Sequence, residues 1–156
     1  MKKLLLALVA MLVVSGAFAQ DYKNSIGLRL GYGAELQYER HFSSENYLEA
    51  NLGLSGFNGR DIFVNATYNW NLCDWNWTPN AGRWFLSAGV GGALGVWGHD
   101  NDKLGFQVGV AGDVAFGIRF NKPVTLSLDY RPTVYFLHNA WGHGFYGVGL
   151  TCTYNF

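Results

Sequence analysis

Strict alternation of side-chain type over residues 104–120 constrains the fold of this chain more than any other feature. Even-numbered positions in this stretch are apolar or glycine, as in Phe106, Val110 and Phe120, whereas odd-numbered positions are small, polar or charged. A period of two residues is typical of a β-strand with two different faces. The stretch is far longer than an ordinary strand of about 5–6 residues. It therefore predicts a long strand with one apolar and one polar face.

The same alternation recurs along the chain, separated by short segments rich in Gly, Asn, Ser and Pro that predict turns. We predict eight strands, at residues 24–32, 34–42, 46–56, 61–71, 83–97, 104–120, 123–136 and 145–156. No connection has room for a crossover helix, so the strands should form an antiparallel meander. An even-numbered meander can close on itself and leave no edge. The predicted fold class is all-β, an eight-stranded antiparallel up-and-down barrel.

The first residues have the pattern of an export signal. Lys2 and Lys3 precede an apolar run at residues 4–14, and Ala17-Phe18-Ala19 places small residues around a cleavage point. The apolar run is too short for a membrane-spanning helix, which needs about 20 residues. We expect a signal peptide at residues 1–19, followed by the barrel domain at residues 20–156.

Alternation alone does not say which face of the barrel points outward, but three features favour an outward apolar face in a membrane. The polar face is rich in Gly, Ser, Ala and Thr, and only 14% of all residues are charged, compared with about 25% in soluble domains. Bulky aromatic residues gather at strand ends, as in an interfacial girdle. The last strand ends on Phe156. The alternative is a soluble secreted lipocalin-like barrel that carries a hydrophobic ligand.

Three segments carry a family resemblance: residues 26–33 (IGLRLGYG), residues 126–132 (LSLDYRP), and the ending Tyr154-Asn155-Phe156. They resemble the small eight-stranded outer-membrane β-barrels of Gram-negative bacteria, the OmpA/OmpX-type superfamily. This resemblance implies a cell outer membrane location, with both termini in the periplasm and the connections near 33, 57–60, 98–103 and 137–144 outside. It also implies a periplasmic turn at 72–82.

The resemblance further implies that Tyr154 and Phe156 are an assembly signal for the barrel assembly machinery. The other expected partners are outer-membrane lipids and lipopolysaccharide, around a monomer. The implied role is structural or interactive, in membrane integrity or surface contact, and not that of an open porin.

The inward face carries a set of ionisable residues that we expect to pair inside the barrel, because buried charges need partners. The expected lumen ion-pair network comprises Arg29, Glu35, Glu39, Glu49, Asp113, Arg119, Asp129 and Arg131, with His41 as a further cation. Such a network would fill the lumen of a narrow eight-stranded barrel. A narrow path for protons or ions is the alternative. Arg40 interrupts the apolar face near a rim, where it can reach lipid head groups.

Enzyme and metal chemistry have weak support in this sequence. A lipid-modifying enzyme would use a His with a Ser nucleophile, but no G-x-S-x-G motif is present, and Ser87 and Ser127 fit as small interior residues. The available histidines are His41, His99, His138 and His143. We predict no catalytic residues and no cofactor.

A repeated Trp-Gly-His triplet makes His99, His143 and Asp100 weak candidates for a metal site, although independent girdle and turn residues explain it as well. The formal net charge of zero argues against a nucleic-acid partner. Cys73 and Cys152 fall on predicted strands that are not adjacent, so we expect two separate thiols.

Overall fold

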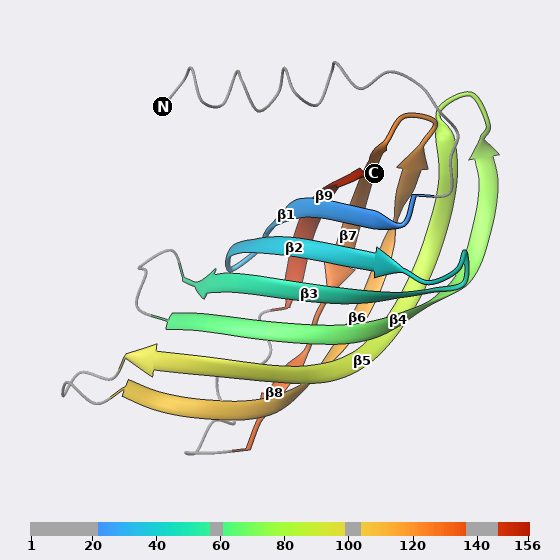
Figure 1. The fold of residues 1–156 in the computed structure, drawn as a ribbon. Helices are drawn as coiled ribbons and strands as arrows, with labels where there is room; N and C mark the ends of the chain where they lie inside the picture. Colours follow the sequence, from blue (N-terminus) through green and yellow to red (C-terminus); the bar gives the residue numbers. More distant parts are fainter. Residues whose placement is uncertain (1–21, 57–60, 99–103, 137–146) are drawn as a thin grey trace, which may run out of the picture.

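The computed structural model describes residues 22–56, 61–98, 104–136 and 147–156, and all of its regular elements are strands (Figure 1). The strands are β1 (Asn24–Leu30), β2 (Gly33–His41), β3 (Asn46–Ser55), β4 (Asp61–Thr78), β5 (Gly82–Gly98), β6 (Leu104–Phe120), β7 (Val124–Tyr130), β8 (Thr133–Tyr135) and β9 (Val148–Asn155). No helix among the described residues has the length and apolar character needed to cross a membrane.

The strands form one closed antiparallel ring. Each strand from β1 to β5 pairs with the next, β6 pairs with both β5 and β7, and β9 joins β7 to β1. Short β8 also pairs with β6, directly after β7, so β7 and β8 are two parts of one wall. Pro132 lies at the break between them and has no N–H to give to the sheet. The ring therefore has eight walls, which confirms the predicted eight-stranded antiparallel barrel.

The largest difference between the predicted and observed strand boundaries is at the end of β4. The sequence suggested that a strand ends at residue 71 and that residues 72–82 form a turn, but β4 continues to Thr78 and pairs with β5 over most of that distance. Register shifts between Asn71 and Cys73, and between Trp75 and Thr78, show how this happens. An extra residue at a β-bulge breaks the alternation without ending the pairing. The simple period-two pattern consequently missed this extension.

Aromatic packing supports the extended β4–β5 hairpin. Trp75 and Trp77 stack with ring centroids 5.1 Å apart, and Trp84 stacks on Phe116 at 5.4 Å. Trp77 and Trp84 are 5.9 Å apart, which joins the two pairs into one aromatic cluster. The cluster lies on the outer face, since Phe116 belongs to the apolar series of β6.

The distribution of side chains is inverted relative to a water-soluble protein. Among the described residues, seventeen polar or charged residues are buried but only seven apolar ones, while thirty large apolar side chains are exposed. The exposed set alternates along the strands: in β1, Ile26, Leu28 and Leu30 are exposed, whereas Ser25 and Arg29 are buried. A lipocalin-like carrier needs an apolar interior, so the structure contradicts the carrier alternative.

The two ends of the barrel differ in what they hold. We call one the turn end, because it carries both Tyr22 and Phe156 and the short connections at 42–45, 79–81 and 121–123. Backbone hydrogen bonds between Asn24 and Phe156, at 3.0 and 2.8 Å, tie the two ends of the described chain together there. The opposite end, the loop end, carries the connections after β1, β3, β5 and β8.

Candidate functional site

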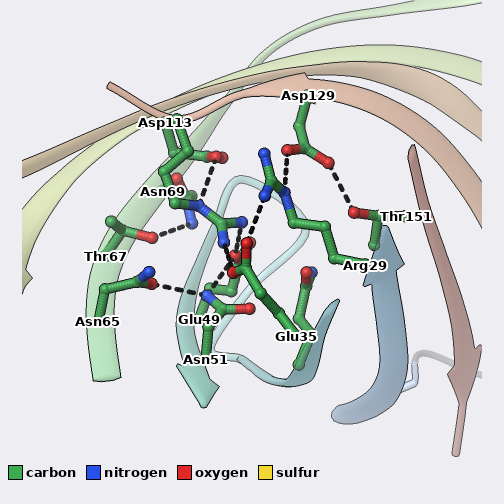
Figure 2. Close-up of polar contacts among 12 residues, drawn as sticks. Arg29, Glu35, Glu49, Asn51, Asn65, Thr67, Asn69, Asp113, Asp129 and Thr151 are labelled. Carbon is green, nitrogen blue, oxygen red and sulfur yellow. Dashed lines mark hydrogen bonds and ion pairs between the residues drawn. The ribbon is translucent and has the colours of Figure 1, made fainter. Parts of the chain in front are cut away.

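The centre of the lumen is occupied by a buried group of charges that we call the central cluster. It consists of Arg29, Glu35, Glu49, Asp113, Asp129 and Arg131. Five strands contribute to it, and Arg131 comes from the break between β7 and β8. Each member falls on an odd-numbered, inward position, which is why alternation in the sequence could find them all. Figure 2 shows acidic side chains from several walls converging on one region.

Arg131 has the most carboxylate partners in the central cluster. Its Nη1 donates to Glu35 at 2.7 Å, its Nε donates to Asp113 at 3.2 Å, and its Nη2 donates to Glu49. The arginine is 5% exposed. Charge-assisted hydrogen bonds of this kind are stronger than neutral ones. Arg131 therefore joins walls that are distant in sequence.

Arg29 forms the second half of the central cluster. It donates to Asp129, to Glu35 and to the carbonyl oxygen of Gly147. Asp129 in turn accepts a hydrogen bond from Thr151 at 2.6 Å (Figure 2). Because Glu35 contacts both arginines, the two halves form one network of two cations and four carboxylates.

Glycine provides the room that this network needs. A Cβ atom at Gly149 would lie 2.6 Å from Cζ of Arg29, and one at Gly53 would lie 2.4 Å from the ring of Phe63 and 2.7 Å from Cγ of Glu35. The guanidinium of Arg29 is held by three partners and cannot move away cheaply. These two positions explain part of the high glycine content.

Neutral polar side chains extend the network along two neighbouring walls, β3 and β4. Asn51 donates to Glu49 at 2.8 Å and to Asn65 at 2.9 Å, and Asn69 donates to Thr67 at 3.1 Å (Figure 2). All of these side chains are buried. They continue the polar filling of the lumen beyond the charged residues.

The half of the lumen nearest the turn end holds a cavity of about 830 Å³, which we call the turn-end cavity. Its walls include Glu49, Asp113, Asp129 and Arg131 of the central cluster at one end and Arg83 of β5 near the barrel rim. Tyr47 crosses part of this space and shares a hydrogen bond with Ser87 at 2.9 Å. The central cluster thus lies at the inner end of the cavity.

Two members of the expected ion-pair network lie outside the central cluster. Arg119 forms an ion pair with Asp74 at 3.2 Å and lies over the ring of Phe85 at 4.0 Å. Asp74 follows the bulge in β4, so sequence reasoning placed it in a turn and missed it. Glu39 accepts from Gln37 at 2.8 Å and contacts His41 at 3.0 Å. Arg40, on the outer face, donates to Asn24 at 2.6 Å.

Ser25, His41 and Glu39 bring together the residue types of a hydrolytic triad, but their geometry differs from one. Nε2 of His41 contacts both Ser25 at 3.3 Å and Glu39 at 3.0 Å. A triad needs one ring nitrogen for the nucleophile and the other for the carboxylate. Ser25 is fully buried and donates its hydroxyl proton to Asn155 at 2.8 Å. This arrangement is a hydrogen-bonded anchor between β1, β2 and β9.

Several predicted features lie outside the described residues or on the outer face. His99, Asp100, His138 and His143 fall outside the described residues, as does the expected signal peptide at residues 1–19. Within the described ranges, no three His, Cys, Asp or Glu side chains are grouped for a metal ion. Cys73 and Cys152 are free and exposed on β4 and β9. The rings of Tyr154 and Phe156 stack with centroids 6.4 Å apart, at the end of β9 and directly after it.

Comparison with known proteins supports the fold. The structure matches the crystal structure of the N-terminal β-barrel domain of Pseudomonas aeruginosa OprF with a TM-score of 0.54. The match covers 85% of this chain and 95% of that domain, at 13% sequence identity. No family model matches this sequence, and no curated protein matches it either. The chain is thus similar in fold to the OprF barrel domain.

Proposed function

We propose that this protein is an integral outer-membrane β-barrel that acts as a passive structural or surface-contact element, with a lumen closed to free flow. The inverted distribution of side chains carries this proposal. In the part of the chain that the structure describes, thirty large apolar side chains point outward from a closed ring, and the buried positions are mainly polar. In a bilayer, such an outer face meets lipid, and closure of the ring satisfies the backbone hydrogen bonds.

The filled centre of the lumen supports a structural role over that of a porin. The central cluster joins five strands at mid-lumen. Towards the loop end, Ala93, Ala111 and Tyr135 pack together as a buried apolar group. Eight-stranded barrels have interiors just wide enough for side chains to fill.

Tyr154 and Phe156 fit a role as assembly signal. Tyr154 lies near the end of β9, Phe156 follows directly after this strand, and Phe156 is 53% exposed. We propose that the barrel assembly machinery binds this end before closure, when β9 has not yet paired with β1. The expected lipid partners, lipopolysaccharide included, would contact the remaining outward face of a monomer.

The first experiment is fractionation of the native cell combined with electrophoresis of heated and unheated samples. A closed membrane barrel should appear in the outer-membrane fraction and should migrate faster without heating. The same shift should appear for the mature chain refolded in detergent. A soluble protein without a heat-dependent shift would overturn the proposal.

A charged substitution on the outer face tests the membrane assignment directly. Val110 of β6 is 49% exposed and lies well inside a long strand. Val110→Arg should cost about 2–4 kcal/mol of folding free energy in lipid vesicles, because arginine near the bilayer midplane is unfavourable. Phe42→Arg, at the turn end, is the matched control and should cost about 0–1 kcal/mol. Equal effects of the two substitutions would argue against a lipid-facing β6.

A further inference from the structure

The turn-end cavity has opposite charge at its two ends. Its inner end, which we call the floor, is lined by Arg131 and four carboxylates, and Arg29, which is not itself a lining residue, pairs with one of these carboxylates. These carboxylates belong to Glu39, Glu49, Asp113 and Asp129. The outer end, which we call the mouth, carries four cations and one carboxylate. The mouth residues are Lys23, Arg40, Arg83, Arg119 and Asp74. A molecule that enters this cavity therefore passes from a positive to a negative environment.

The mouth contains two arginines in direct opposition. Arg83 of β5 and Arg119 of β6 are register partners in the sheet, and both occupy inward positions. Like charges directly opposite each other on a sheet are destabilising. Asp74 pairs with Arg119 at 3.2 Å. No ion pair of Arg83 occurs among the described residues.

The guanidinium of Arg119 is also held in a fixed orientation. Besides Asp74, it donates to Asn71 at 3.3 Å and lies 4.0 Å above the centre of the Phe85 ring. A pre-oriented guanidinium is well suited to a carboxylate, which can bind it through two parallel hydrogen bonds. The pair formed by Arg83 and Arg119 thus offers a position for a carboxylate at the mouth.

The floor has the opposite preference, for hydrogen-bond donors. Gln37 and Asp113 line the cavity and are 3% and 2% exposed. Oε1 of Gln37 and Oδ2 of Asp113 accept no hydrogen bond from the described residues. Unsatisfied buried acceptors cost free energy. Together with the excess of carboxylates, they favour a cationic group that carries several N–H donors.

We propose that the turn-end cavity binds a short zwitterionic peptide. Its carboxylate would lie between Arg83 and Arg119, and its ammonium group would face the carboxylates of the floor. The volume of about 830 Å³ is within the range of ligand pockets, about 300–1,000 Å³, and exceeds the needs of a single amino acid. This inference goes beyond the proposed structural role and does not depend on it.

The test is calorimetric titration of the refolded barrel in detergent with three probes: trialanine, N-acetyl-trialanine and trialanine amide. The first probe has both charged termini, and each of the others lacks one. Trialanine should bind saturably, and each blocked peptide should bind at least about tenfold more weakly, because each loses a charge-assisted hydrogen bond. Absence of saturable trialanine binding, or equal binding of the three peptides, would overturn the proposal.

A pair of variants tests where the carboxylate of the bound peptide lies. Arg83→Gln should weaken trialanine binding at least about tenfold and leave the binding of trialanine amide unchanged. Lys122→Gln is the matched control, since Lys122 is exposed at the same end but does not line the cavity. Equal affinity of the two variants for trialanine would contradict the assigned position.

The heat-dependent gel shift of the same samples separates the two proposals. A wild-type protein that shows the shift but binds no trialanine would remove the peptide site and leave the barrel proposal standing. The three probes act on the wild-type protein, so this result does not depend on how any variant folds.

Discussion

The central cluster and the rim pair formed by Arg119 and Asp74 are both ion pairs inside one barrel, but their surroundings differ. The side chains of the central cluster are 1–6% exposed, whereas those of Arg119 and Asp74 are 31% and 35% exposed. In the cluster, each arginine has at least two carboxylate partners. The comparison indicates that the same residue types stabilise the barrel to different extents, according to how much water reaches them.

We expect the largest loss of unfolding free energy from removal of Arg131, the arginine with the most carboxylate partners. Arg131→Met would leave Glu49 and Asp113 without a cation, whereas Glu35 would keep its ion pair with Arg29. Removal of one partner from a buried ion pair costs about 3–5 kcal/mol, because the remaining charge stays buried. Unfolding of the refolded barrel by guanidinium chloride measures this loss. Arg131→Lys, which keeps the charge, should lose less, and equal losses would mean that charge is not the stabilising property.

A smaller effect is expected where the central cluster contacts the backbone. Gly149→Ala would place a methyl group 2.6–2.8 Å from three atoms of the Arg29 guanidinium. Such overpacking costs about 1–3 kcal/mol. Gly92→Ala is the matched control in β5, because the nearest atom to its new methyl group would be the oxygen of Gly109 at 3.9 Å. The same denaturant titration should show almost no change for the control, and a similar loss in both would contradict the close packing of Arg29.

The smallest effect is expected at the rim. Arg119→Gln removes an ion pair that is partly open to solvent, so the unfolding free energy should fall by about 0.2–1 kcal/mol. The difference from wild type should shrink as salt is added, because exposed charges are screened. The loss caused by Arg131→Met should be much less sensitive to salt. A loss above 3 kcal/mol for Arg119→Gln would remove the distinction between the two groups.

Sequence reasoning found the members of the central cluster because alternation assigns each residue to one face. It could not separate them from Arg119, which shares the inward face but lies nearer the turn end, or from Glu39, which contacts His41 and not the two buried arginines. The face of a residue depends on its own strand, whereas its height along the lumen relative to other walls depends on how eight strands pair. The bulge after Asn71 caused a second error in the prediction from sequence. Because of the register shift, Asp74 lies on the inward face and β4 continues to Thr78.

The sequence by itself determined the strands, the eight-walled ring and the face that carries each side chain, because a strand places neighbouring residues on opposite sides. Only the tertiary structure decided which charges meet, that Arg131 joins Glu35, Glu49 and Asp113, and that a cavity remains at the turn end. The physical reason is that these contacts cross the lumen between walls far apart in sequence. Their distances are fixed by ring closure and register, which no local pattern records.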